Sequence, residues 1–210
     1  PAEVDGDVLE ERVLILDGSG SGGSLYSVTA PGEEYALLAS SPSGSRAVHA
    51  SGDAIYVSGV AAITIHDGSR RDALTRRNAI ATTSPYTALD SAGDYLYAMS
   101  TDEVAVFDIA NPFAPRPLGT IATAAAGDTF HDMVVHGNLI YLVLEETSPS
   151  YRSGIRVFAI PSDPESPSYP VEGEYFEASS EPLQDVVVMG HLVALSSTLG
   201  SSSNYNGRIV

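Results

Sequence analysis

The residues best suited to chemistry in this sequence lie five and six positions ahead of two glycines that separate apolar segments. Histidine nitrogens and carboxylate oxygens are ligands of Zn²⁺, and carboxylates also bind Ca²⁺. If the fold brings equivalent positions together, one of these two ions could be held there. The alternative is structural, because an Asp ahead of a turn can bond backbone amides. The metal candidates are His131, Asp132 and Asp185, with Gln184 as a polar binding residue beside them and Arg46 at the matching position of an earlier unit.

No other set of residues has the spacing of a catalytic site. The chain has no cysteine, which excludes disulfides, thiolate zinc sites and cysteine nucleophiles. It contains no Gly-x-Ser-x-Gly motif, and its five histidines show neither His-x-His nor His-x-x-x-His spacing. The sequence therefore favours a non-catalytic protein whose candidate cofactors are limited to Ca²⁺ or Zn²⁺.

The charge of the chain narrows the class of partner. Its 210 residues carry 27 acidic and 10 basic side chains, a formal net charge of -17, and every basic residue is an arginine. Such a surface repels nucleic acid and anionic lipid, and no segment approaches the roughly 18 apolar residues of a membrane helix. We therefore expect no nucleic-acid partner and no membrane insertion. One link holds four arginines that either bind an acidic partner or a neighbouring copy, or form a solvated loop, namely Arg70, Arg71, Arg76 and Arg77.

A repeat supplies the elements that would position these residues. Four glycines, spaced 41, 44 and 53 residues apart, each divide two apolar segments that alternate with polar residues. Gly followed by Asp or Asn at such a place predicts a tight hairpin turn with positive φ. These turn glycines are Gly52, Gly93, Gly137 and Gly190. Counting from them assigns two sets of equivalent core positions: Val48, Leu89, Met133 and Val186 before the turn, and Ile55, Leu96, Ile140 and Val193 after it.

The length of the repeat predicts the fold. Units of about 40–50 residues with three or four short strands are typical of β-propeller blades. We therefore predict an all-β protein of four-stranded antiparallel blades, with about four blades visible. Residues 1–11 are expected to be an acidic lead-in, and the repeats to fill residues 12–210. The predicted parts are an outer strand at 12–17 and units at about 35–67, 80–108, 118–160 and 174–210.

The two ends of the repeat region predict a larger ring. A ring closed by four blades has one vacant outer strand, whereas residues 12–17 and 208–210 both offer one. Propellers commonly use four to eight blades. We therefore expect these blades to be about half of a larger propeller, completed by the same polypeptide or by a second chain.

One stretch resembles a known family. Residues 104–119, Val-Ala-Val-Phe-Asp-Ile-Ala-Asn-Pro-Phe-Ala-Pro-Arg-Pro-Leu-Gly, resemble the LVIVD-type repeat of secreted bacterial and archaeal β-propellers. Residues 160–167 repeat the proline spacing, and the resemblance covers about residues 12–210. The chain departs from the pattern where no proline link follows Asp67, and where Ala194 replaces the usual Tyr. The resemblance implies a propeller in a secreted or surface protein, and it brings no catalytic set.

The function expected from these observations is a non-catalytic binding or scaffold module. It would be extracellular, at the cell surface or in the periplasm, and would present its loops to a protein or a glycan. The alternative is a metal-assisted hydrolase or lyase that works at the propeller channel. An ion bound by His131, Asp132 or Asp185 would distinguish the two.

Overall fold

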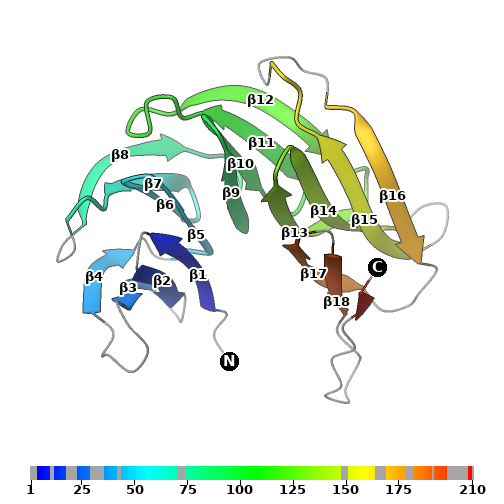
Figure 1. The fold of residues 1–210 in the computed structure, drawn as a ribbon, viewed down its shortest axis with the longest axis horizontal. Helices are drawn as coiled ribbons and strands as arrows, with labels where there is room; N and C mark the ends of the chain where they lie inside the picture. The colour runs from blue at the N-terminus through cyan, green and yellow to red at the C-terminus, as the bar shows by residue number, and fades with distance from the viewer. Residues whose placement is uncertain are drawn as a thin grey trace. The chain divides into compact units, whose positions relative to one another are not determined.

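The computed structural model of the protein describes residues 4–9, 12–17, 23–28, 36–41, 44–70, 74–147, 151–163, 169–177, 182–190, 192–197 and 208–209. For the strands before residue 42, and for residues 208–209, the description covers the backbone. The elements of this part of the chain are β-strands, shown in Figure 1. None of the described residues forms a helix that is long and apolar enough to cross a membrane.

Within the described residues the strands form five sheets, and each sheet follows the order of the chain. The first sheet contains β1 (Val4–Leu9), β2 (Arg12–Asp17), β3 (Gly23–Val28) and β4 (Ala36–Ser41), and the second contains β5 (Ala47–Ser51), β6 (Ala54–Ser58), β7 (Ala62–Asp67) and β8 (Thr75–Ala81). The third contains β9 (Ala88–Ala92), β10 (Tyr95–Met99), β11 (Glu103–Asp108) and β12 (Arg116–Thr123).

The fourth and fifth sheets complete the described part of the chain. The fourth contains β13 (Thr129–His136), β14 (Leu139–Glu146), β15 (Arg152–Ala159) and β16 (Val171–Glu177), and the fifth contains β17 (Leu183–Met189), β18 (Leu192–Ser197) and β19 (Arg208–Ile209). The ladders of β1–β8 and β13–β19 are antiparallel. The prediction of an all-β protein of four-stranded antiparallel sheets is confirmed.

The turn glycines set the register of the hairpins, as the sequence predicts. Their φ angles are 56° at Gly52, 55° at Gly93, 64° at Gly137 and 61° at Gly190. A Cβ atom added at any of the four would meet no atom within 4 Å. Backbone conformation, rather than crowding, therefore favours glycine at these turns.

The core positions counted from these glycines are confirmed. Seven of the eight side chains are at most 8% exposed. The eighth, Val193, is half-buried and packs against a cluster of Val143, Ile155, Val186 and Leu195. Strand alternation places these residues on one face of their sheets, so a fixed distance from the turn fixes which side chains are buried.

Two tyrosines join a central strand to the proline-rich link of the following repeat. The Tyr56 hydroxyl donates a hydrogen bond to the carbonyl oxygen of Pro112 at 3.0 Å. The Tyr97 ring meets the edge of the Tyr169 ring, with centroids 6.4 Å apart. Burial raises the pKa of Tyr56 to about 12 and raises the pKa of Tyr97 as well. Both phenols therefore act as neutral packing groups.

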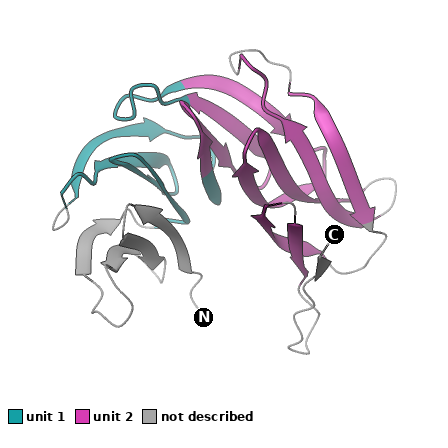
Figure 2. Ribbon diagram, viewed as in Figure 1, with its two compact units in different colours: residues 1–89, 108–116 teal, residues 90–107, 117–210 magenta. Residues whose placement is uncertain are grey.

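The described chain divides into two compact units, drawn in Figure 2. Unit 1 consists of residues 1–89 and 108–116, and unit 2 of residues 90–107 and 117–210. Within unit 1, β1 lies beside β5; within unit 2, β13 lies beside β17. In each unit the first strand of one sheet thus neighbours the first strand of the next.

The structure corrects the predicted boundaries at the start of the chain. Residues 4–9, expected in an acidic lead-in, form β1 and pair with residues 12–17. Residues 12–17 are therefore the second strand of a complete sheet and not an outer strand, and β4 closes this sheet instead of opening the next unit. Asp5 and Asp7 stand at alternate positions, which an antiparallel strand accepts, but Gly6 between them leaves few apolar residues to mark the strand. The described part thus has five sheets. The prediction of a larger ring relied on two outer strands, at residues 12–17 and 208–210, and the first of these is not an outer strand.

The core register predicts a specific loss of stability. The Ile55 side chain is fully buried, so Ile55→Ala should lower the free energy of unfolding by about 2–4 kcal/mol. Val60→Ala is the matched control in the same unit, because Val60 is 56% exposed and its truncation should change stability by less than about 0.5 kcal/mol. Urea denaturation followed by circular dichroism measures both, and equal losses would contradict the register.

Candidate interaction surfaces

Asp132, a predicted metal ligand, connects two sheets through backbone amides. Its Oδ1 accepts the N–H of Met133 at 2.8 Å, next to it in β13. Its Oδ2 accepts the N–H of Val186 at 2.8 Å, in the first strand of the following sheet. Both oxygens therefore have the amide partners that the structural interpretation of the sequence expects.

Asp90 makes the same pair of contacts one repeat earlier. Its Oδ1 accepts the N–H of Ser91 at 2.7 Å, and its Oδ2 accepts the N–H of Val135 at 2.6 Å. We call these two carboxylates, Asp90 and Asp132, the carboxylate bridges. Sequence counting missed Asp90 because it stands three residues before its turn glycine, whereas Asp132 stands five before. The ladder from Asp132 to His136 is regular, so the difference lies in how far each bridging Asp stands from its turn; the bulge in β13 lies ahead of Asp132.

The three predicted metal ligands do not form one group. The Asp185 Oδ2 accepts the Ser196 hydroxyl at 2.5 Å, and the His131 Nε2 lies 3.3 Å from Glu145 Oε2. Gln184 donates to the carbonyl of its neighbour Leu183 at 3.4 Å. In the part of the chain that the structure describes, no cluster of three or more His, Asp and Glu side chains could hold a metal ion.

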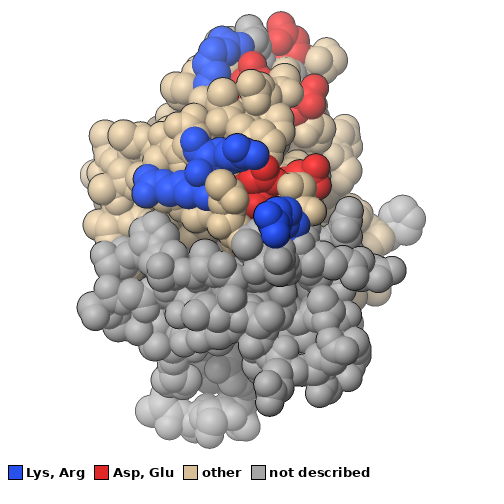
Figure 3. All heavy atoms as spheres, turned by 90° about the vertical axis from the view of Figure 1, so that its left-hand side faces the viewer, with Lys and Arg blue, Asp and Glu red and all other residues tan. Residues whose placement is uncertain are grey.

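Most of the predicted arginine residues lie on the surface of unit 1. Arg46 precedes β5, Arg70 follows β7, and Arg76 and Arg77 lie in β8; all four are exposed. Arg71 lies outside the described residues. Figure 3 shows blue arginine side chains gathered on one face, with red carboxylates beside some of them. We call Arg76 and Arg77, together with the exposed strand β8 that carries them, the β8 arginine surface.

Arg77 is held in place by contacts on both sides of its guanidinium. Its Nη2 lies 2.6 Å and its Nε 3.1 Å from Asp67 Oδ2. Its Cζ stands 5.8 Å from the centre of the Phe113 ring, within cation–π range. The Asn78 amide donates to the Phe113 carbonyl at 3.0 Å, which ties the ring's loop to β8. Hydrogen bonds from Ser69 and from Arg77 lower the pKa of Asp67 to about 2, so this carboxylate is ionised at neutral pH.

The next repeat builds the same device at the end of β11. The Asp108 Oδ1 accepts the Ala110 N–H at 2.9 Å, and Asp108 Oδ2 lies 3.1 Å from Arg116 Nη2. The bond from the Ala110 N–H, followed by the bond from Arg116, lowers the pKa of Asp108. An Asp that ends the third strand thus caps the turn with one oxygen and binds an arginine beyond that turn with the other.

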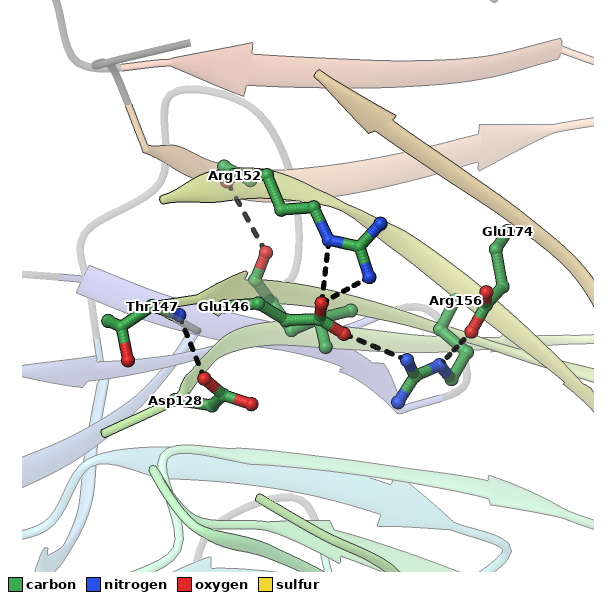
Figure 4. A network of polar contacts seen from close by, with 8 residues as sticks. Asp128, Glu146, Thr147, Arg152, Arg156 and Glu174 are labelled. Atoms are coloured by element: carbon green, nitrogen blue, oxygen red, sulfur yellow. Dashed lines mark hydrogen bonds and ion pairs between the residues drawn. The ribbon is translucent and has the colours of Figure 1, made fainter. Parts of the chain in front are cut away.

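A second polar group lies on β14, β15 and β16 in unit 2, shown in Figure 4. Glu146, whose side chain is 10% exposed, accepts from Arg152 Nε at 2.7 Å and from Arg156 Nη2 at 2.9 Å. Arg156 also donates to Glu174, and the Arg152 Cζ stands 4.2 Å from the centre of the Phe176 ring. Sequence reasoning did not connect these residues, because their pairing depends on strand register. Two arginines and two glutamates compensate one another's charge here, so this group serves the sheet itself.

His66, in β7, is a buried titratable group of unit 1. The Thr64 hydroxyl donates to the Val57 carbonyl at 3.3 Å and therefore accepts from His66 Nε2, 3.1 Å away. The other ring nitrogen, Nδ1, is buried without a hydrogen-bond partner among the described residues. Burial, with the nearby charge of Arg76, lowers the pKa of His66. His66 is therefore a neutral packing residue.

Comparison with known proteins identifies the fold. No protein-family model and no curated protein matches this chain. Among solved structures, it is similar to the N-terminal domain of Nup159, with a TM-score of 0.56 and 12% identity over 99% of this chain and 57% of that one. It is also similar to Hsv2 from Kluyveromyces lactis, with a TM-score of 0.55 and 12% identity over 99% of this chain and 64% of that one. A functionally unknown protein from Desulfotomaculum acetoxidans is similar with a TM-score of 0.68 and 11% identity, over 99% of this chain and 74% of that one.

At these identities the likeness shows the fold alone. The chain has a β-propeller fold, and its four-stranded antiparallel sheets are propeller blades. It spans less than two thirds of the length of the Nup159 domain and of Hsv2.

The environment of His66 predicts a pH dependence of stability. Because its pKa is lower in the folded state, the folded protein binds fewer protons than the unfolded chain. Stability should therefore be highest above the unfolded pKa of about 6.5 and fall as the pH drops below it. His66→Gln should flatten this dependence, whereas His136→Gln, at an exposed position, should leave it unchanged. Urea denaturation at several pH values measures it, and equal slopes in all three proteins would contradict the assignment.

Proposed function

We propose that this protein is a non-catalytic binding or scaffold module, secreted or at the cell surface, that binds a protein segment at the β8 arginine surface. The observation that carries the proposal is an exposed, positively charged edge strand on a chain of net charge -17. The motif at residues 104–119 supports a place in the LVIVD-type repeat family, whose resemblance implies such a setting.

Charge at the surface favours an acidic partner. Arg76 is exposed, and no carboxylate within the described ranges is paired with its guanidinium. Arg77 is also exposed and is held by Asp67 and by the Phe113 ring. A fixed arginine, beside one that no described carboxylate pairs with, offers a partner carboxylate a charge-assisted hydrogen bond with little further loss of side-chain freedom.

Strand order favours a protein over a glycan. β8 is the last strand of its sheet and pairs with β7 on one side. Its residues Thr75 to Asn78 are exposed. An edge strand offers backbone N–H and C=O groups, which an extended peptide can pair with as an added strand. An acidic peptide in that position would bring its carboxylates close to the two arginines.

The shifted pKa values support a structural use of the carboxylates. Among the described residues, two carboxylates have a lowered pKa. Hydrogen bonds from the Ser69 side chain, from Arg77 and from the Ser69 amide account for the shift of Asp67, and bonds from the Ala110 amide and from Arg116 for that of Asp108. Catalytic groups are usually shifted by burial and by convergence on a pocket. The shifts seen here are those of surface turns.

A synthetic peptide tests the proposal. The probe is a fluorescein-labelled peptide of alternating Glu and Val, and a Lys–Val peptide of the same length is the control of opposite charge. Fluorescence anisotropy measures the binding of each peptide. We expect the Glu peptide to bind, more weakly at higher salt, and Arg76→Glu to weaken binding by about three- to tenfold. Arg46→Glu is the control, because it makes the same change of charge at the opposite edge of the same sheet.

Three results would contradict the proposal. Absence of binding by the Glu peptide would remove the surface as a site. Equal weakening by Arg46→Glu and Arg76→Glu would show that only the net charge matters. If heparin displaces the peptide and binds the protein more tightly than the peptide does, the surface is a site for a sulfated glycan instead.

A further inference from the structure

The fifth sheet has an uncovered apolar face. Val187 and Met189 in β17 and Leu192 in β18 are 53%, 61% and 49% exposed. Met189 pairs directly with Leu192, and Val187 lies two residues before Met189 on the same face of the strand. The three side chains therefore form one continuous patch, which we call the β17 outer face.

The other face of the same strands is covered by the fourth sheet. Val186 and Leu195 are buried against Val143 and Ile155 of β14 and β15. Residues 186–189 read Val-Val-Val-Met, apolar at every position. A continuous apolar run is the pattern of a strand covered on both faces, because a strand with one wet face alternates with polar residues.

The fourth sheet shows what complete coverage looks like. Successive residues of β14 point to opposite faces, and Leu142, Val143 and Leu144 are all at most 1% exposed. The fifth sheet carries the same kind of residues on both faces, but within the described part of the chain only one of its faces is buried.

Asp185 continues the series of carboxylate bridges. Asp90 accepts an amide of β13, and Asp132 accepts an amide of β17, so each bridge reaches the first strand of the following sheet. Asp185 stands five residues before its turn glycine, as Asp132 does, and beside a bulge of the same kind. It is exposed, and its Oδ2 accepts a hydroxyl from its own sheet. The Asp185 carboxylate is thus placed to receive a backbone amide of a following sheet.

We propose that the β17 outer face and Asp185 together form a docking surface for a further β-sheet blade of a longer form of this same polypeptide. The blade would cover Val187, Met189 and Leu192 with its own apolar face, and its first strand would donate a backbone N–H to Asp185. The longer solved propellers support a single polypeptide as the source, because this chain spans 57%, 64% and 74% of their lengths.

Cysteine labelling tests the proposal, since these 210 residues contain no cysteine to interfere. Met189→Cys places a thiol on the docking surface, and Val60→Cys places one at a comparably exposed site in unit 1, 56% exposed. In the 210-residue chain both thiols should react with a maleimide dye at similar rates. In the longer natural polypeptide Cys at 189 should react at least about tenfold more slowly, while Cys at 60 keeps its rate.

A second labelling position and a substitution of Asp185 test the proposal independently of Met189→Cys. Leu192→Cys should be protected in the same way, so that failure of one variant to fold leaves the other informative. Asp185→Asn should lower the midpoint of urea unfolding of the longer polypeptide and leave that of the 210-residue chain unchanged.

Three outcomes would overturn the proposal. Equal labelling of the two sites in the longer polypeptide would leave the face uncovered. Protection at 189 in the 210-residue chain that rises with concentration, with dimers in light scattering, would assign the face to a second copy. A natural polypeptide that holds no further sheet would remove the proposed occupant.

Discussion

The rest of this structure depends on a backbone N–H of one sheet being accepted by a carboxylate of the sheet before it. β13 and β17 are first strands of their sheets, so each presents N–H groups that its own ladder leaves unpaired. Asp90 and Asp132 accept two of them, from Val135 and Val186. A half-buried amide left without a partner costs about 1–3 kcal/mol, whereas an ionised acceptor makes a stronger bond than a neutral one. Apolar packing stabilises the contact between sheets without specifying its alignment, and the carboxylate bridges supply that alignment in unit 2.

The same use of an Asp explains the sequence pattern at the end of the third strand. Asp108 follows Val-Ala-Val-Phe because one of its oxygens must take the Ala110 amide while the other holds Arg116 across the turn. Asn111 then accepts the Phe113 amide at 3.3 Å, which begins the proline-containing turn. The link between repeats is thus specified by two Asx-type turns rather than by its prolines alone. In both repeats the arginine that this Asp holds, Arg77 or Arg116, lies on the last strand of its sheet.

The turns and the buried faces of the strands could be predicted from the sequence, whereas the contacts between sheets could not. Turn glycines and alternation depend on neighbouring residues, so the burial of Ile55 or Met133 follows from counting. Asp90 was missed because its partner amide lies 45 residues away, and because it stands two residues closer to its turn glycine than Asp132 does. The first sheet was misassigned because Gly6, between two acidic residues, leaves β1 with few apolar side chains to mark it as a strand. The metal interpretation treated equivalent positions as converging, whereas the Asp132 oxygens are both bonded to backbone amides.

Hydrogen exchange at the Val186 amide tests the central claim most directly. Two-dimensional NMR spectra of the protein and of Asp132→Asn, recorded after transfer to D₂O, report the exchange of this amide separately from its neighbours. The amide group of Asn presents an N–H donor in place of one carboxylate oxygen and weakens the bridge. The account predicts that the Val186 amide exchanges at least about tenfold faster in the variant, while the Val135 amide, held by Asp90, keeps its rate. An unchanged rate at Val186, or an equal increase at both amides, would contradict it.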